Sequence, residues 1–142
     1  MSESANALAV LVDAGAMIAL LDRSDAHHQA CVAALANIHA PLLTVWPALT
    51  EAMHLLSEVP RAARALLDLV GDGGIELTEL DHSDVGRLAE LMEKYNDLPM
   101  DFSDAALVRA AEQSGASRIL TFDKHFKVYR LPRKQRFTIL PA

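Results

Sequence analysis

The sequence predicts an α/β fold in which helices cover both faces of a mostly parallel β-sheet. Short apolar runs of strand length alternate with stretches of helix length along the chain. This alternation is typical of parallel sheets built from strand-helix-strand units. The first run, residues 8–12 (LAVLV), is apolar at every position. A strand of this kind is expected to be buried on both faces of a parallel sheet.

Local signals support the bounds of the first elements. After the strand at 8–12 we expect helices at 14–21 and 24–38, a strand at 42–45, and helices at 48–57 and 61–70. Ser24 is a suitable N-cap for the second helix. Trp46 and Pro47 mark a turn into the third, and the glycine-rich residues 71–74 close the fourth.

The second half of the chain continues the same alternation. Residues 75–80 alternate weakly and predict a strand, followed by helices at 83–95 and 103–114, the latter ended by Gly115. Residues 118–122 (RILTF) and 137–140 complete the expected strands. The chain has no internal repeat, low-complexity segment or linker, so we expect residues 1–142 to form a single domain.

Composition and cysteine content bound the class of protein. Hydrophobic residues make up 51% of the 142 residues, enough for a domain with its own core. No apolar run approaches the roughly 20 residues of a membrane helix, and no basic segment precedes the first apolar run as in a signal peptide. The single cysteine, Cys31, excludes an internal disulfide and lies in an apolar helical pattern typical of the core. We therefore expect a cytoplasmic protein without membrane association.

Acidic residues gather where this fold class binds ligands. Asp13 and Asp123 each follow an expected strand, and parallel α/β sheets bind ligands beyond the carboxyl ends of their strands. Asp101 and Asp104 are three residues apart and share one face at the start of a helix. Glu51 lies at the edge of the apolar stripe of its own helix. Because clustered carboxylates repel one another, a divalent metal ion is the obvious candidate to lie between them.

Four of these acids also have a purely structural interpretation. Asp101 is a suitable helix N-cap, and Asp104 is favourable near the positive end of the helix dipole. Asp123 suits the start of a turn, and the long Glu51 side chain can reach solvent. From the residues alone, both interpretations remain open.

The distribution of charge bears on the substrate. The net charge of −6 argues against nucleic acid as a partner. However, seven of the thirteen Lys and Arg residues lie between residues 118 and 136, where Asp123 is the single acid. A basic segment next to the acids favours a phosphate-rich substrate, whereas a solvated C-terminal face is the plainer alternative.

Several other sites are excluded or disfavoured. The six histidines are scattered and there is one cysteine, which disfavours a zinc site. The chain has neither a GxxxxGK[ST] phosphate-binding loop nor a GxGxxG segment after a strand. No Ser, Cys or Thr lies in a nucleophile motif.

Four segments together resemble the motifs of PIN-domain nucleases, in the family's order. They are DAGAMIALLD with Asp13, TVWPALTEAMHLL with Glu51, PMDFSDAALVRAAEQSG with Asp104, and RILTFDKHF with Asp123. The chain is most similar to bacterial VapC-type toxins, which are small PIN domains. This resemblance implies a three-layer α/β/α sandwich with a parallel sheet.

The resemblance also implies a chemistry. It implies that Asp13, Glu51, Asp104 and Asp123 hold Mg²⁺, or Mn²⁺, and hydrolyse RNA, with Asp13 and Asp104 as the principal ligands. Asp101 is an extra acid that either joins the metal site or only caps the helix. The basic residues after Asp123 would hold the RNA backbone, so the candidate substrate-binding residues are Lys124, Lys127 and His125.

The resemblance further implies partners, and two alternatives compete with the nuclease. Toxins of this kind usually form homodimers and are inhibited by a cognate antitoxin. The first alternative is a non-catalytic RNA- or protein-binding module on the same fold. The second is a receiver-like phosphoacceptor domain. A receiver would have an acidic pair near its first strand and a lysine after a late strand, whereas this chain has no acid in residues 8–12 and has Asp123 at the late position.

Overall fold

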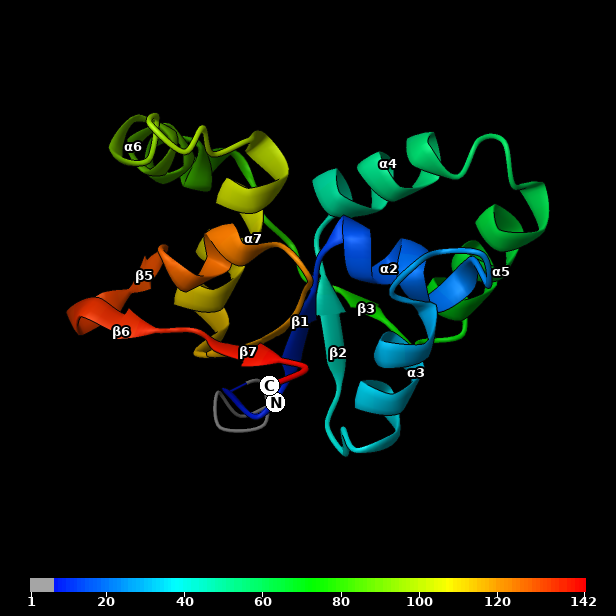
Figure 1. Ribbon diagram of the computed structural model, residues 1–142. Helices are drawn as coiled ribbons and strands as arrows, with labels where there is room; N and C mark the ends of the chain where they lie inside the picture. Colours follow the sequence, from blue (N-terminus) through cyan, green and yellow to red (C-terminus); the bar gives the residue numbers. More distant parts are fainter. Residues whose placement is uncertain (1–6) are drawn as a thin grey trace.

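A five-stranded parallel sheet forms the centre of the protein in the computed structural model, which describes residues 7–142. The strand order is β3-β2-β1-β4-β7, and every neighbouring pair is parallel. The strands are β1 (Val10–Val12), β2 (Leu42–Thr44), β3 (Glu76–Leu77), β4 (Arg118–Leu120) and β7 (Thr138–Leu140). The expected α/β class with a mostly parallel sheet is therefore confirmed (Figure 1).

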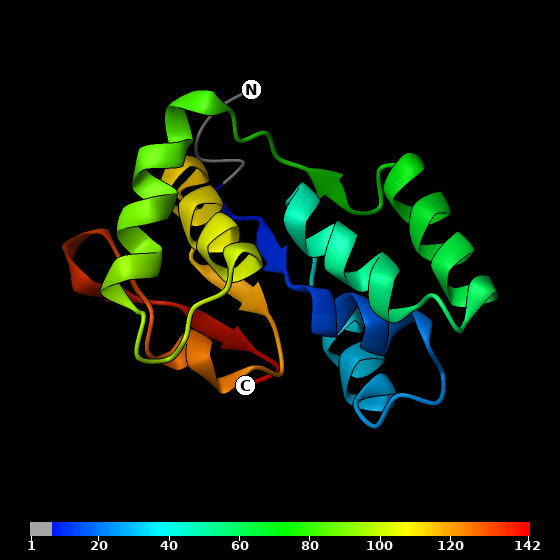
Figure 2. The same ribbon diagram turned by 90° about the horizontal axis from the view of Figure 1, so that it is seen from above.

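Helices flank the sheet and complete the expected sandwich. They are α2 (Ala14–Leu21), α3 (His28–Ala36), α4 (Trp46–Leu55), α5 (Pro60–Gly71), α6 (Val85–Lys94) and α7 (Phe102–Ser114). Seen from above, α6 and α7 lie on one side of β1, and α2 to α5 lie on the other (Figure 2). Between residues 7 and 142, no helix has the length and apolar character to cross a membrane.

Several expected bounds were wrong, and three of these differences stand out. Helix α3 begins at His28 rather than Ser24, because the backbone N–H and hydroxyl of Ser24 both donate to Asp22 and hold a turn there. Trp46 and Pro47 belong to α4, since proline has no N–H to lose in the first turn of a helix. The strand expected at 75–80 is reduced to β3.

A small antiparallel hairpin lies outside the main sheet and was not predicted. It pairs β5 (Arg130–Leu131) with β6 (Gln135–Arg136). Its tip holds Arg133 and Lys134 at φ of 62° and 60°, in the left-handed region that side chains other than Gly rarely adopt. No Gly or Asn at the tip signals such a turn in the sequence.

The core is apolar, as the composition predicts. Leu11, Met17, Leu107 and Ile119 are fully buried between the sheet and its helices. Cys31 is buried as well, which confirms its expected place in the core. Burial raises the pKa of the Cys31 thiol to about 11, so this group stays protonated and unreactive at neutral pH.

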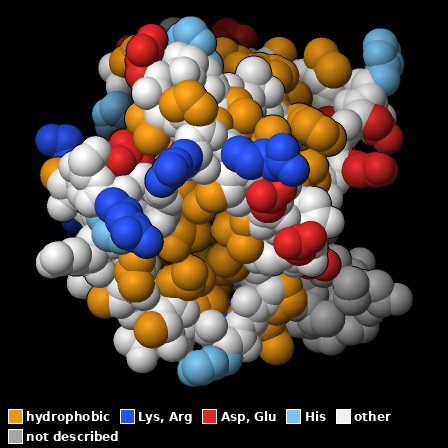
Figure 3. Space-filling view, turned by 90° about the vertical axis from the view of Figure 1, so that its right-hand side faces the viewer, with side chains coloured by type: hydrophobic (Ala, Val, Ile, Leu, Met, Phe, Trp, Pro, Cys, Tyr) orange, Lys and Arg blue, Asp and Glu red, His pale blue; other side chains and the backbone are white. Residues whose placement is uncertain are grey.

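One outer face of the protein carries exposed hydrophobic side chains. Figure 3 looks onto the side that carries α3 and α5, where hydrophobic side chains gather in a hollow with Lys and Arg side chains beside it. Val32 on α3 and Leu67 on α5 are about half exposed. Hydrophobic surface gathered in this way is typical of an interaction site.

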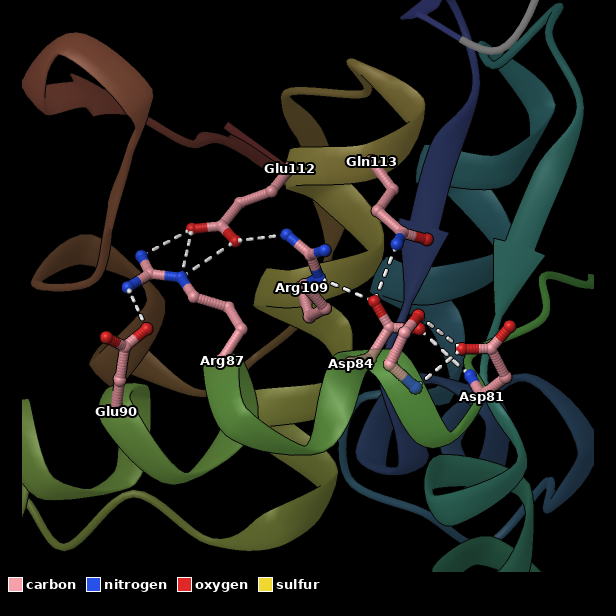
Figure 4. Close-up of polar contacts among 8 residues, drawn as sticks. Asp81, Asp84, Arg87, Glu90, Arg109, Glu112 and Gln113 are labelled. Atoms are coloured by element: carbon pink, nitrogen blue, oxygen red, sulfur yellow. Dashed lines mark hydrogen bonds and ion pairs between the residues drawn. The ribbon is translucent and has the colours of Figure 1, made fainter.

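A charged network joins the start of α6 to α7 (Figure 4). Asp84, which is 2% exposed, accepts hydrogen bonds from Arg109 at 2.8 Å, Gln113 at 2.6 Å and the Asp81 backbone N–H at 2.9 Å. Glu112 pairs with both Arg87 and Arg109. The Asp81 N–H and Arg109 hold the pKa of Asp84 below its usual range.

We predict that Asp84→Ala destabilises the protein by about 2–4 kcal/mol, because Arg109 and Gln113 lose a buried partner. The matched control is Asp68→Ala, which breaks the exposed Arg64–Asp68 pair and should cost less than about 0.5 kcal/mol. Urea denaturation measures both. Because the pKa of Asp84 is lowered on folding, the difference should persist at neutral pH and shrink as the pH falls through that lowered value. Equal costs for the two variants would contradict a stabilising network.

Candidate metal centre

All five acids predicted from the sequence line one pocket of about 290 Å³. They reach it from separate elements: Asp13 follows β1, Glu51 lies in α4, and Asp123 follows β4. Asp101 and Asp104 lie at the start of α7. Parallel strands bring their carboxyl ends to the same edge of a sheet, which is why residues distant in sequence meet here.

Asp13 is held rigidly at the base of the pocket. It caps α2, since its Oδ1 accepts the Ala16 N–H at 2.8 Å, and its Oδ2 accepts the Thr121 hydroxyl. Its side chain is nearly buried. Burial raises the pKa of Asp13 to about 6, and repulsion from Asp123 and Glu51 adds to burial while the two hydrogen bonds oppose it. The carboxylate is thus fixed in position, but its negative charge is poorly compensated.

Asp104 is the second carboxylate whose negative charge is poorly compensated. Its Oδ2 accepts the Tyr129 hydroxyl at 2.8 Å. Burial is the main cause that raises the pKa of Asp104 to about 7, and repulsion from Asp101, Asp123 and Asp13 contributes in the same direction. Burial and the Asp104 charge together raise the pKa of Tyr129, so that Tyr129 remains a hydrogen-bond donor.

Asp101 is the N-cap of α7, as its structural interpretation predicts. Its Oδ1 accepts the Asp104 backbone N–H at 2.7 Å. It also lines the pocket, so capping and a place beside the acids are not exclusive. Asp13 and Asp123 show the same combination, because each caps the helix that follows it.

Asp123 begins a short 3₁₀-helix, η2 (Lys124–Lys127). It accepts the His125 N–H at 2.9 Å and donates its own backbone N–H to the Thr121 hydroxyl oxygen at 3.0 Å. Ligand-capable atoms of Asp104, Asp123 and His125 lie within 4.8 Å of one another. His125, expected only at the substrate, thus stands close enough to the acids to take part in a metal site.

Glu51 reaches the pocket from α4. Partial burial raises its pKa, and repulsion from Asp101 and then Asp123 adds to this. The expectation that Glu51 faces a cleft beside the core agrees with its position. Asp25 and His27, from the turn before α3, also line the pocket and were not anticipated.

Two residues that orient the acids were missed by sequence reasoning. Thr121 contacts Asp13 from 108 positions away, and Tyr129 contacts Asp104 from 25 positions away. Thr121 could have been noticed, because it lies two residues before Asp123 at the end of a predicted strand. Tyr129 carries no local signal, since its role depends on how η2 folds back onto α7.

The donor set of the pocket fits a hard divalent cation. Carboxylate oxygens dominate its lining, and no Lys or Arg is among the lining residues that the structure describes. Burial, with repulsion from neighbouring acids, raises the pKa values of Asp13, Glu51 and Asp104, so their negative charges are poorly compensated. Mg²⁺ and Mn²⁺ prefer such oxygen ligands, and either ion would supply the missing charge.

The basic segment does not form one surface beside the acids. Lys124 and Lys127 are exposed on η2, directly after Asp123. Arg118 donates to the Leu8 carbonyl at the opposite end of β4, and Arg130 donates to backbone carbonyls that include that of Lys127. Charge counted along the sequence therefore overstated the positive surface near the site.

Comparison with known proteins finds relatives of this chain by sequence. The sequence model of the PIN domain family matches residues 10–131. A curated relative is ribonuclease VapC26 of Mycobacterium tuberculosis, 28% identical over an alignment of 136 residues that covers 93% of this chain and 100% of the relative.

Solved structures share the fold at low sequence identity. VapC20 of Mycobacterium tuberculosis, a sarcin-ricin loop cleaving toxin, has a TM-score of 0.77 and 20% identity over 84% of this chain and 93% of its own. VapBC2 of Rickettsia felis, bound to a promoter DNA fragment, has a TM-score of 0.64 and 12% identity, covering 92% and 96%. PAE2754 of Pyrobaculum aerophilum has a TM-score of 0.57 and 23% identity, covering 94% and 89%.

The matched segment begins at β1, before Asp13, and ends after Asp123, so it contains every acid of the pocket. The five-stranded parallel sheet agrees with the fold of the solved relatives. With most of its length matched and its fold in agreement, this chain belongs to the PIN domain family, as its four motifs predict.

Proposed function

We propose that this chain is a metal-dependent endoribonuclease and the toxin of a type II toxin–antitoxin pair. The observation that carries the proposal is the meeting of Asp13, Glu51, Asp104 and Asp123 in one pocket, with the pKa values of Asp13 and Asp104 well above the ordinary range. Carboxylates poised in this way are typical of a functional site. The relatives named ribonuclease VapC26 and toxin VapC20 support the substrate and the biological role.

In the proposed site, Asp13 and Asp104 are the principal metal ligands, with Asp123 and Glu51 as further ligands or as groups that orient bound water. A bound Mg²⁺ or Mn²⁺ would lower the pKa of a water nucleophile and neutralise charge on the phosphate. The protein's own contribution is placement: Thr121 and the Ala16 N–H fix Asp13, and Tyr129 fixes Asp104. Rigid placement of this kind is what an oriented attack on phosphorus requires.

Asp101, His125, Lys124 and Lys127 take supporting roles in this proposal. Asp101 acts chiefly as the cap of α7 and adds negative charge to the pocket. His125, close to Asp104 and Asp123, contacts either the metal or the substrate. Lys124 and Lys127 hold the RNA backbone beside the acids.

The partners follow from the relatives and from one exposed surface. VapBC2 of Rickettsia felis is a structural relative, and on that analogy we propose a cognate antitoxin for this chain. The hydrophobic hollow over α3 and α5 is a suitable surface for it (Figure 3). The homodimer and the single domain over residues 1–142 also stay predictions.

The alternatives are weaker. A non-catalytic RNA- or protein-binding module would not need four acids in one pocket, where burial raises the pKa values of Asp13 and Asp104, because buried unpaired carboxylates cost stability. The receiver-like phosphoacceptor expects a lysine in its pocket, and the lining described here contains none.

We predict that metal stabilises the folded protein. Mg²⁺ or Mn²⁺ at about 100 times its Kd should raise the Tm of the wild type by about 5–10 °C, because it binds the folded state alone. The double variant Asp13→Asn/Asp104→Asn should show almost no rise. Thermal melts with and without EDTA measure this.

The matched control for the melts is Asp25→Asn, which removes one charge from the rim of the same pocket. It should keep most of the metal-dependent rise. An identical rise in the wild type and the double variant would remove the argument for a metal at Asp13 and Asp104.

We predict that substitutions of Asp104 and of Asp101 have clearly different effects on RNA cleavage and on stability. Asp104→Asn should lower the rate of RNA cleavage at least about 100-fold, because it removes a charge that holds the metal. Its Tm should hold or rise, since a carboxylate with a raised pKa has gone. Asp101→Asn should be nearly silent in both measurements, and Asp101→Ala should cost about 1 kcal/mol of stability.

A Mg²⁺-dependent cleavage assay on a structured RNA, with melts of the same preparations, makes this comparison. If Asp101→Asn abolishes cleavage while Asp104→Asn remains active, Asp101 is the ligand and the assignment is reversed. If both Asn variants remain fully active, α7 does not carry the active site.

We predict that Lys124 and Lys127 hold phosphates. Charge reversal at both positions should weaken RNA binding and flatten its dependence on salt, since fewer counterions are released. The matched control reverses Arg133 and Lys134, which lie at the hairpin tip. Equal losses in the two double variants would mean that RNA is attracted by overall charge rather than by η2.

A further inference from the structure

The aromatic residues of the chain are divided between the core and the candidate site. The sequence contains seven Phe, Tyr and Trp residues, and none is in residues 1–6. Four are buried: Tyr95, Phe126, Tyr129 and Phe137. The other three, Trp46, Phe102 and Phe122, line the acid pocket or a groove next to it. Every aromatic residue of the chain that is not fully buried therefore lies at this site.

Trp46 and Phe102 line a groove that opens from the acid pocket. The groove has a volume of about 650 Å³. Glu51, Asp101 and Ser103 line both the groove and the acid pocket, so the two spaces are adjacent. A strand whose phosphate lies at the acids would thus pass directly into this groove.

The two rings are exposed but are anchored on rigid elements. The Trp46 and Phe102 residues are 60% and 52% exposed, although large aromatic side chains are favoured inside proteins. They are the first residues of α4 and α7, two helices that pack on each other. The Thr50 hydroxyl donates to the Trp46 carbonyl at 2.9 Å, and Asp101 caps α7. Anchored rings lose little freedom when a ligand covers them.

The charges in the groove select against a phosphate. Glu51 and Asp101 are acidic, and the described lining contains no Lys or Arg, whereas Lys124 and Lys127 follow Asp123 on a different element. A nucleobase is uncharged and presents an aromatic face, so it suits such a groove. The lining of the acid pocket also includes two stacked rings, His27 and Phe122, with centroids 4.4 Å apart and an interplanar angle of 9°.

We propose that Trp46 and Phe102 form a stacking platform for an unpaired nucleobase of the RNA strand next to the phosphate that the acids hold. The proposal rests on the ribonuclease function proposed above and adds two residues that position the substrate. A base in a duplex is stacked on its neighbours and paired, so it cannot lie on the platform. The platform therefore selects single strands and loops, and Trp46 and Phe102 are positioning residues for cleavage there.

Trp46 is the single tryptophan of the chain, so its fluorescence reports directly on the groove. The full-length protein is kept in a buffer that contains Ca²⁺, an ion that accepts the same oxygen ligands. It is titrated separately with a short unpaired RNA, with the same RNA carrying abasic sites, and with a duplex. We expect quenching by the unpaired RNA and little by the other two. Fluorescence is read on mixing, and the recovered RNA is examined on a gel.

Substitutions then test the energetic contribution of the ring. Binding is measured for all variants with fluorescently labelled RNA. Trp46→Ala should weaken binding of the unpaired RNA by about 5- to 150-fold, the usual effect of losing one base-stacking ring, while Trp46→Phe should keep most of the affinity. Abasic RNA should bind wild type and Trp46→Ala equally. The matched control is Leu55→Ala, an equally exposed apolar side chain at the other end of α4, which should leave binding unchanged.

Three outcomes would overturn the proposal. The first is equal quenching by unpaired and abasic RNA, and the second is equal affinity of wild type and Trp46→Ala for the unpaired RNA. The third is a blue shift of Trp46 emission that grows with protein concentration and is unaffected by RNA, which would assign the groove to a second copy of the chain. Failure of the ribonuclease function is distinguishable, since it would leave the quenching intact while Mg²⁺-dependent cleavage is absent.

Discussion

The parallel pairing of β1 with β4 is the constraint on which the candidate site depends. The pairing sets Val12 opposite Leu120, so the residues that follow, Asp13 and Thr121, leave the sheet side by side and form a hydrogen bond. Asp123 comes two residues later and donates its backbone N–H to the same Thr121 hydroxyl oxygen. A shift of one residue in this register would turn each side chain to the opposite face of the sheet and separate the two acids.

The acids of the pocket serve the fold and the candidate chemistry with the same atoms. Asp13, Asp101 and Asp123 each accept a backbone N–H at the start of a helix, which stabilises both the helix and the ionised carboxylate. Burial acts in the opposite direction, with repulsion among the acids added to it, and raises the pKa values of Asp13 and Asp104. The fold can therefore tolerate a crowded acidic pocket, and a cation that binds there relieves a cost already present.

Much of the fold and most of the pocket could be predicted from the sequence. The apolar strand at 8–12 and the rule that ligands bind at strand carboxyl ends were enough to place Asp13 and Asp123 together. The start of α3 was misjudged because Ser24 has a competing local partner, Asp22. Tyr129 and the β5–β6 hairpin were missed because each depends on contacts between segments distant in sequence. Local sequence patterns predict the helices and strands and the edge of the sheet where ligands bind. The groups that orient the acids are decided by tertiary packing.

The buried thiol of Cys31 has a practical consequence. It is the single cysteine of the chain, it lies in the core, and its pKa of about 11 leaves almost no thiolate at neutral pH. Oxidants and alkylating reagents act on the thiolate, so the folded protein has no reactive sulfhydryl group. A cysteine introduced at any exposed position would then be the one site of labelling. Spectroscopic probes or cross-linkers can therefore be attached at chosen positions without first removing the native residue.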